Sequence, residues 1–355
     1  MNDRLESELR LAVLCATGSD RHERFDDGAG AVDRGGHPPI NYHAYAACLG
    51  GSFHRGLETL GADDDVVLLL LSRHLGLNLR LLRRLKASGR AVLVAFKETG
   101  FQQILERIGT PRRLRAMREV LALADGCLSP TRALAPVYAA LTAAPVAAIP
   151  TPYPVDDPRW DFSRPDGSHH GIFVGTREFF NPTRNHLLSL VLLRQVAAST
   201  GEPVTVINTD GFRGDWLLRS LGYPDGALRV LRGRRPYADY LREMASHKAV
   251  FQMDQSTVPG QVAGDALLCR LPCVGGNGEI ESIAFPEFSA GAAEGARCLE
   301  AVTRLCRDEA WRRHCVEASQ ARARERVSFQ AVAPQLRRFI ATIRDRLSPG
   351  ASRPA

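Results

Sequence analysis

The residues best suited to binding a charged ligand lie in a turn and a predicted helix in the second half of the chain. Residues 249–253 are predicted to form a strand, and a helix is predicted to begin at Gln261. The N–H groups of a first helical turn have no intrahelical partner, so they favour a diphosphate. Gly260 would let a phosphate approach the backbone closely. Asp265, about one turn further on, could accept hydrogen bonds from two ribose hydroxyls.

Two arginines near another predicted strand end could clamp the diphosphate. Arg177 follows a strand that ends before Gly175, and Arg184 comes seven residues later. Open α/β sheets bind ligands at the carboxyl ends of their strands. Guanidinium groups there could stabilise the leaving group's developing charge without a metal. The structural alternatives are two ordinary surface arginines and, for Asp265, a solvated helix residue, although its apolar neighbours argue against exposure.

Two further strand ends supply candidates for contacting the base of a nucleotide. Asn208 follows the strand predicted over residues 204–207. Arg234 lies in the turn after the strand predicted over residues 229–231. Both lie at the carboxyl end of a strand, where ligands of open sheets bind.

Short apolar runs alternate with amphipathic helical patterns along most of the chain, and this alternation predicts βαβ units in a doubly wound sheet. A polar, glycine-bearing loop is predicted over residues 17–41. Helices are predicted at residues 75–87, 114–124, 184–199, 297–308, 309–327 and 329–347. Strands are predicted at residues 11–16, 66–71, 91–96, 126–128, 146–149, 171–174, 204–207, 229–231, 249–253 and 273–274.

The chain exceeds the size at which one hydrophobic core usually stops growing, so two domains are expected from its 355 residues. Residues 150–170 hold five prolines and no apolar periodicity, which favours a domain boundary there. We therefore expect a Rossmann-like domain over residues 1–155 and a second over 156–330. Residues 331–355 are expected to form a helix that packs back on the first domain, followed by a polar tail.

Residues 257–274 (TVPGQVAGDALLCRLPCV) resemble the signature segment of the retaining GT-B glycosyltransferases of family 4. In that family the pattern is Glu-Gly-Phe-Gly, four variable residues, Glu-Ala, a small hydrophobic helix and Thr-Pro-Val-Val. Gly260 matches the second glycine, Asp265 with Ala266 the Glu-Ala pair, and Pro272 the proline. Thr257 departs from the pattern, because it stands where the first glutamate is expected.

Two more segments are similar to the same family, in the same order along the chain. Residues 173–177 (FVGTR), followed by Arg184, resemble its strand ending in Val-Gly-Arg with a basic residue several positions on. Residues 325–329 (ERVSF), with Val332, resemble its Glu-x-Phe-Ser-Trp segment before a terminal helix. The resemblance implies a GT-B fold, with two Rossmann-like domains facing an interdomain cleft and a C-terminal helix crossing back.

The resemblance also implies a function: transfer of a sugar from a nucleoside-diphosphate sugar to a glycan, lipid-linked or small-molecule acceptor, with retention and without a metal or cofactor. A sugar-nucleotide epimerase of the same fold and a degenerate domain that only binds a nucleotide sugar are the alternatives. The donor is expected in the C-terminal domain and the acceptor in the N-terminal one. The expected donor-binding residues are Gly175, Arg177, Arg184, Asn208, Arg234, Thr257, Pro259, Gly260, Gln261, Val262 and Asp265.

Candidate catalytic residues in the first half follow two predicted strands. The family usually carries a histidine after the strand that corresponds to residues 91–96, and here Lys97 and Glu98 stand in its place. A carboxylate there could orient the acceptor or stabilise positive charge at the anomeric carbon, and Lys97 could hold it ionised. His74 follows the strand predicted at residues 66–71. The structural alternatives are an exposed Lys–Glu pair and a structural histidine.

The charge of +7 invites a nucleic-acid interpretation, but the arginines are spread along predicted helices without interleaved aromatic residues. We therefore expect no nucleic acid partner. A membrane surface or an anionic lipid-linked acceptor is compatible with this charge.

The apolar runs are too short to span a membrane and the N-terminus lacks a secretory pattern, which favours a cytoplasmic location, at most peripheral at the inner membrane face. The eight cysteines include no C-x-x-C pair, so reduced thiols and no metal site are expected. An acidic run at residues 63–65 is the nearest match to a metal-binding Asp-x-Asp triplet, and a solvated turn is expected there.

Overall fold

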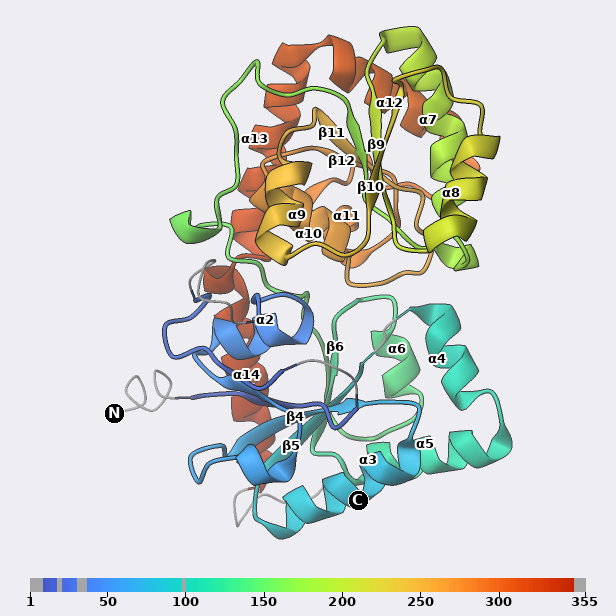
Figure 1. Ribbon diagram of the computed structural model, residues 1–355. Helices are drawn as coiled ribbons and strands as arrows, with labels where there is room; N and C mark the ends of the chain where they lie inside the picture. Colours follow the sequence, from blue (N-terminus) through green and yellow to red (C-terminus); the bar gives the residue numbers. More distant parts are fainter. Residues whose placement is uncertain (1–8, 18–20, 31–36, 98–99, 348–355) are drawn as a thin grey trace. The chain divides into compact units, whose positions relative to one another are not determined.

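The structure is a computed structural model that describes residues 9–17, 21–30, 37–97 and 100–347. It divides into two compact units, each built on one sheet (Figure 1). Unit 1 comprises residues 1–154 together with 327–355, and unit 2 comprises residues 155–326. Unit 1 is therefore assembled from two segments that are far apart in the sequence.

Unit 1 contains a sheet whose described strands lie in the order β2-β3-β1-β4-β5-β6-β7. All neighbouring strands are parallel except β2 and β3, which pair antiparallel. The strands are β1 (Ala12–Leu14), β2 (Glu23–Arg24), β3 (Ser52–His54), β4 (Val66–Leu71), β5 (Ala91–Phe96), β6 (Gly126–Ser129) and β7 (Val146–Ala148). The helices are α2 (Asn41–Cys48), α3 (Leu75–Ala87), α4 (Phe101–Ile108), α5 (Pro111–Leu123), α6 (Ala135–Ala139) and α14 (Phe329–Leu347), with a 3-10 turn, η1 (Leu57–Thr59).

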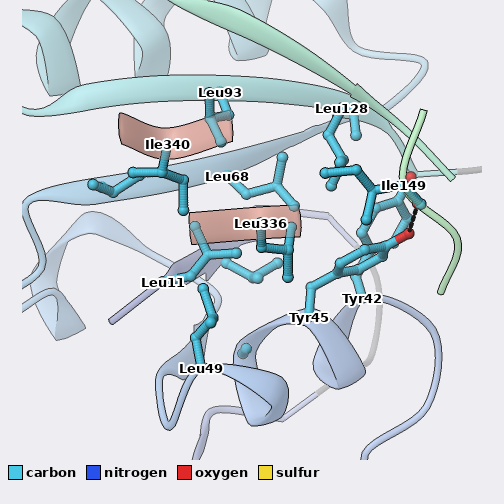
Figure 2. Close-up of a cluster of buried hydrophobic side chains, with 14 of the residues drawn as sticks. Leu11, Tyr42, Tyr45, Leu49, Leu68, Leu93, Leu128, Ile149, Leu336 and Ile340 are labelled. Atoms are coloured by element: carbon cyan, nitrogen blue, oxygen red, sulfur yellow. Dashed lines mark hydrogen bonds between the residues drawn. The ribbon is translucent and has the colours of Figure 1, made fainter. Parts of the chain in front are cut away.

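Alternate residues of the central strands face two separate cores, as the pleat of a strand requires. In β4, Leu68 and Leu70 pack on the face covered by α2 and α14, whereas Leu69 and Leu71 pack on the face covered by α3 and α5. Figure 2 shows the first of these cores, with Leu336 of α14 among the strand side chains. This two-sided burial explains why β4 and β5 are continuous apolar runs.

A buried tyrosine ties α2 to the far side of the same core. The Tyr45 hydroxyl donates to the Ile149 carbonyl at 2.7 Å (Figure 2). Tyr42, on the same helix, donates to the Phe96 carbonyl at the end of β5. Both buried hydroxyls thus have a backbone carbonyl as acceptor inside the unit.

Unit 2 contains a parallel sheet with the order β10-β9-β8-β11-β12. Its strands are β8 (Ile172–Val174), β9 (Val204–Asn208), β10 (Leu228–Arg232), β11 (Ala249–Phe251) and β12 (Cys273–Val274). Its helices are α7 (His186–Thr200), α8 (Gly211–Ser220), α9 (Tyr237–Met244), α10 (Gln261–Leu268), α11 (Glu279–Ala284), α12 (Gly295–Arg307) and α13 (Glu309–Arg326). Three 3-10 turns complete it: η2 (Pro158–Trp160), η3 (Pro182–Arg184) and η4 (Ala292–Glu294).

The predicted α/β class is confirmed, and several predicted elements have the predicted bounds: β4, β5, β12, α3 and α14. The predicted loop over residues 17–41 is wrong at Glu23 and Arg24, which pair as β2 with β3. Nothing was predicted at α2, β3, α4, α6, α8, α9 or α11. Most of these elements are short, and β3 carries one apolar residue, Phe53, between two polar ones. The apolar residues of α4 and α9 do recur at helical spacing, but each helix spans only eight residues, and this signal was overlooked. Among the described helices, none combines the length and the apolar character needed to cross a membrane.

Leu336→Ala is expected to destabilise unit 1 by about 2–5 kcal/mol, because the substitution leaves a cavity where α14 meets the sheet. The measurement is urea unfolding followed by circular dichroism. Leu347→Ala, on the same helix at a side chain 45% exposed, is the matched control and should change the unfolding free energy little. Equal effects of the two substitutions would contradict a core role for α14.

Candidate functional site

The order of strands in unit 2 reverses direction between β8 and β11. The chain adds β9 and β10 on one side of β8, then returns to place β11 and β12 on the other side. Because β8 and β11 pair in parallel, the loops that leave their carboxyl ends share one edge. Ligands of open α/β sheets bind at such a switch point. This edge is the candidate site.

A glycine lets the first turn of α10 pack directly against the end of β8. A methyl group at Gly175 would overlap Cγ1 of Val262 in α10 and lie 3.1 Å from Cγ1 of Val250 in β11. Any larger residue would push α10 away from the strand ends. The Val262 side chain thus packs against Gly175. Because Gly175 has no side chain, the segment that carries Arg177 can lie close to α10.

No side chain caps the start of α10. Its N-cap, Gly260, adopts φ +93° and offers no side chain to cap the first-turn N–H groups. The left-handed conformation favours glycine here, and a methyl group would overlap the carboxylate of Glu281. By contrast, the neighbouring start of α11 is closed, because its N–H groups at Glu279 and Ile280 donate to the carbonyls of Val258 and Pro259 at 3.0 and 3.1 Å.

Thr257 holds a strained backbone in the loop between β11 and α10. Its φ is +53°, which a β-branched residue rarely adopts. Asn277 compensates from the next loop: its side chain accepts from the Thr257 N–H at 2.9 Å and donates to the Thr257 hydroxyl at 3.2 Å. Strain of this kind concentrates at ligand sites. Thr257 therefore lies at the expected place, although it is not the glutamate of the family pattern.

Arg184 links the loops after β8 and β11. Its guanidinium forms ion pairs with Asp254 and, at 3.0 Å, with Glu178, and donates to the Ser256 hydroxyl at 3.2 Å. Burial alone would lower the pKa of Arg184, but Asp254 and Glu178 raise it. The charge of Arg184 is therefore already balanced by protein carboxylates.

Arg177 differs from Arg184 in this respect. It is exposed, and its guanidinium makes no ion pair with a carboxylate of the described residues. Its charge nevertheless acts on Asp265, because it lowers the pKa of that carboxyl group. Arg177 thus supplies positive charge near α10 that is available to an anionic ligand.

Asp265 is buried, with 1% of its surface exposed, and its carboxylate is held by protein donors. The Tyr237 hydroxyl in α9 donates to Oδ1, and Tyr240 and Gln261 also bond to the side chain. Burial raises the pKa of Asp265 to about 7, against the opposing effects of Tyr237 and Arg177. The alternative of a solvated helix residue is thus excluded, and a ribose contact would require one of these donors to move.

Glu281 in α11 is buried between the loop after β11 and the loop after β12, with 2% of its surface exposed. Gln252 donates to its Oε1 at 2.7 Å, while Oε2 has no partner among the described residues. A methyl group at Gly260 or Gly278 would overlap this carboxyl group, and one at Gly276 would lie 3.2 Å from Oε1. Burial raises the pKa of Glu281 to about 8, and the nearby charge of Asp254 adds to the effect.

The two proposed base contacts lie at neighbouring strand ends in different environments. The buried Asn208 amide donates to the Gly211 carbonyl at 2.9 Å and to Asp215 at 2.8 Å, and its oxygen accepts from the Asp210 N–H at 2.9 Å. These bonds fix the start of α8. Arg234 is exposed in the turn after β10. The structure does not bring either side chain into contact with Asp265 or Arg177.

In unit 1, the catalytic candidates lie at the carboxyl ends of the adjacent strands β4 and β5. Lys97 donates from Nζ to the Thr17 carbonyl at 3.1 Å, which ties β5 to the segment after β1. His74 is exposed at the start of α3, where its Nε2 accepts from Arg73 at 3.3 Å. No described interaction joins the two side chains. Glu98 lies outside the described residues.

Sequence reasoning missed several residues that hold the site together, among them Tyr237, Gln252, Asp254 and Glu281. Gln252 was placed inside a predicted strand that in fact ends at Phe251. Asp254 was placed in the turn without a role, although its position after a strand is a usable signal. Within the described ranges, no group of three or more His, Cys, Asp or Glu side chains is arranged to hold a metal ion.

No protein-family description matches the sequence, and no curated protein matches it either. Solved structures do match the fold. HepE of Anabaena, in complex with UDP, aligns over 94% of this chain and 100% of its own, with a TM-score of 0.64 and 13% identity. A UDP-forming α,α-trehalose-phosphate synthase from Burkholderia xenovorans aligns over 87% of this chain and 81% of its own, with a TM-score of 0.62 and 12% identity.

An α,α-trehalose 6-phosphate synthase from Burkholderia multivorans also matches, over 81% of this chain and 73% of its own, with a TM-score of 0.59 and 10% identity. These structures are GT-B glycosyltransferases, so the chain has the GT-B fold with two Rossmann-like domains. The likeness extends across several GT-B enzymes and does not single out family 4.

Glu281→Gln is expected to flatten the dependence of stability on pH. An ordinary glutamate ionises near 4.5, whereas the native state holds its proton up to about pH 8. Between these values the unfolded chain releases a proton that the native state keeps. As pH rises, the wild type should therefore lose up to about 1.4 kcal/mol more unfolding free energy per pH unit than the variant, in which other groups such as Asp265 still contribute to the pH dependence.

Urea unfolding at several pH values between about 5 and 8 measures this difference. Glu300→Gln, at an exposed position on α12, is the matched control and should follow the wild type. Parallel curves for wild type and Glu281→Gln would show that Glu281 ionises normally in the native state.

Proposed function

We propose that this protein is a glycosyltransferase that uses a nucleoside-diphosphate sugar and binds it in unit 2. The observation that carries the proposal is a convergence at the β8/β11 switch point. An arginine without a carboxylate partner, an uncapped helix start and a buried carboxylate one turn behind it share this edge. Such a set matches a diphosphate followed by a ribose.

A uridine nucleotide is the first choice of donor. HepE is named in complex with UDP, and the Burkholderia xenovorans synthase is named as UDP-forming. In this proposal Arg177 and the α10 N–H groups bind the diphosphate and stabilise charge on the departing nucleotide. Arg184 holds the loops in place through Asp254 and Glu178, and Asp265 contacts the ribose.

The acceptor is proposed to bind to unit 1, at the carboxyl edge formed by β4 and β5. Lys97 and His74 are the candidates for orienting it, and Glu98 remains a candidate on sequence grounds alone. The identity of the acceptor is open between a glycan, a lipid-linked sugar and a small molecule. Retention at the anomeric carbon rests on the resemblance to family 4.

Turnover separates this proposal from its alternatives. A transferase should release UDP from a UDP-hexose in the presence of a suitable acceptor. An epimerase would convert one UDP-hexose into another or release free UDP and the epimer, with no acceptor needed. A protein that binds UDP but neither transfers nor epimerises any UDP-hexose, across a broad panel of acceptors, would instead be a nucleotide-sugar-binding partner of another enzyme.

Arg177→Gln is expected to weaken UDP binding by about tenfold or more, because it removes a charge-assisted bond to the diphosphate. Isothermal titration calorimetry on the folded variant measures the dissociation constant. Arg219→Gln, which removes an exposed arginine of α8 in the same unit, is the matched control and should bind UDP like the wild type. Unchanged affinity in Arg177→Gln would remove this residue from the site.

Turnover is expected to survive EDTA, because Arg177 and the helix N–H groups supply the positive charge that a cation supplies in metal-dependent transferases. The acidic run at residues 63–65 belongs to unit 1, where Asp64 accepts from the Gly61 N–H at 2.7 Å. A steady-state assay with chelator, then with added Mg²⁺ or Mn²⁺, decides the point. Loss of activity that either ion restores would refute metal independence.

A further inference from the structure

A small basic pocket lies at the opposite edge of the unit 2 sheet from the candidate nucleotide site. Its volume is about 160 Å³. It is lined by the segment before β8, by the turn between α10 and β12, and by α13, so it borders the amino ends of the strands. Ligand pockets for nucleotide-sized molecules run to about 300–1,000 Å³, so this pocket suits a small ion or a single chemical group.

Four arginines line the pocket: Arg164, Arg270, Arg312 and Arg313. Two of them form ion pairs with described carboxylates and two do not. Arg270 pairs with Asp161 at 2.8 Å, and Arg313 pairs with Asp166 at 3.1 Å. Arg164 and Arg312 make no ion pair with a carboxylate of the described residues. Their side chains donate to backbone carbonyls, from Arg164 to Arg242 at 3.1 Å and from Arg312 to Leu305 at 3.0 Å.

Arg312 is the more unusual of the two unpaired arginines, because only 8% of its surface is exposed. A guanidinium is always charged, and a buried charge without a counter-charge costs several kcal/mol. The Leu305 carbonyl is the one hydrogen-bond acceptor of the Arg312 side chain among the described residues. A bound anion would supply both the charge and the acceptors.

A histidine that lines the same pocket also has a ring nitrogen without a hydrogen-bond partner among the described residues. Nδ1 of His169 is buried and has no hydrogen-bond partner among the described residues. Burial lowers the pKa of His169, and the charges of Arg312 and Arg164 lower it further, while Asp166 and Glu309 oppose them. An anion seated beside the ring would accept a hydrogen bond from it.

We propose that this pocket binds a small phosphoryl group, held by the guanidinium groups of Arg164 and Arg312 and by the ring of His169. A phosphoryl group offers three acceptor oxygens to donors that come from different segments, whereas a carboxylate offers two in one plane. The site is separate from the proposed nucleotide site and does not depend on it. The phosphoryl group would come either from inorganic phosphate or from a small phosphate ester.

Calorimetric titrations of the full chain at constant ionic strength test the proposal, with inorganic phosphate, glycerol phosphate and acetate as separate ligands. The wild type should bind phosphate or the ester with a dissociation constant of about 1 mM or tighter. Arg164→Gln and Arg312→Met should each weaken this binding about tenfold or more. Tighter binding of the ester than of phosphate would identify a phosphorylated metabolite as the source.

Two control variants locate the site. Arg219→Gln tests for a general loss of positive charge, and Arg177→Gln tests for phosphate bound at the nucleotide site instead. Both should bind phosphate like the wild type. Arg164 is exposed, so Arg164→Gln stays informative even if Arg312→Met fails to fold. The His169 ring, followed by NMR, should titrate at higher pH when phosphate is present, since a nearby anion favours the imidazolium.

Four results would overturn the proposal: no phosphate binding to the wild type, binding to Arg164→Gln and Arg312→Met as tight as to the wild type, loss of binding in Arg177→Gln, or acetate binding as tight as phosphate. The third result would place phosphate at the strand carboxyl edge. The fourth would leave a general anion site without phosphoryl preference. Failure of UDP to bind would bear on the proposed function alone.

Discussion

The candidate site depends on one buried carboxyl group. Glu281 lies where the loop after β11 and the loop after β12 meet, and both loops reach it with glycines, Gly260 on one side and Gly276 and Gly278 on the other. A side chain at Gly260 or Gly278 would displace the carboxyl group, so the backbone must pass close to it. The positions of Thr257, of the α10 start and of Asp254 follow from how these loops close around Glu281.

Burial and the nearby charge of Asp254 both raise the pKa of Glu281, so this arrangement favours its protonated form. The guanidinium of Arg184 forms an ion pair with Asp254, so the negative charge of Asp254 is balanced by a cation of the protein. Arg177 is left as positive charge at the edge. The site therefore separates two tasks: one arginine stabilises the protein and the other is available to a ligand.

The sequence was informative wherever burial imposes a pattern. Residues 66–71 and 91–96 are buried on both faces, and that produces the apolar runs that predicted β4 and β5 with correct bounds. The helix α14 was equally clear, because one stripe of its surface enters a core. By contrast, β3 pairs through its backbone with only Phe53 as an apolar signal, and it was missed.

The candidate site was predictable in position and less so in detail. Strand ends and Gly260 drew attention to the edge of unit 2 where β8 and β11 end, since those signals are local. The partners of Arg184 and Asp265 come from segments 70 and 28 residues away, and pairing at such distances leaves no periodic trace. Glu281 was overlooked because α11 spans six residues and begins with two acidic side chains in its first turn, which is typical of an exposed helix start.

The discontinuous composition of unit 1 has a consequence for how the chain is made. Its first 154 residues leave the ribosome before unit 2, yet one face of their sheet is covered by α14, which is synthesised near the end. Until then, α2 alone covers that face, and apolar side chains such as Leu68 and Leu93 lack the part of their cover that α14 supplies. Unit 2 is continuous in sequence, so it can fold during translation before α14 is available to complete unit 1. A ribosome that stalls before residue 329 would thus release a chain with one finished unit and one exposed core, which is a natural substrate for chaperones.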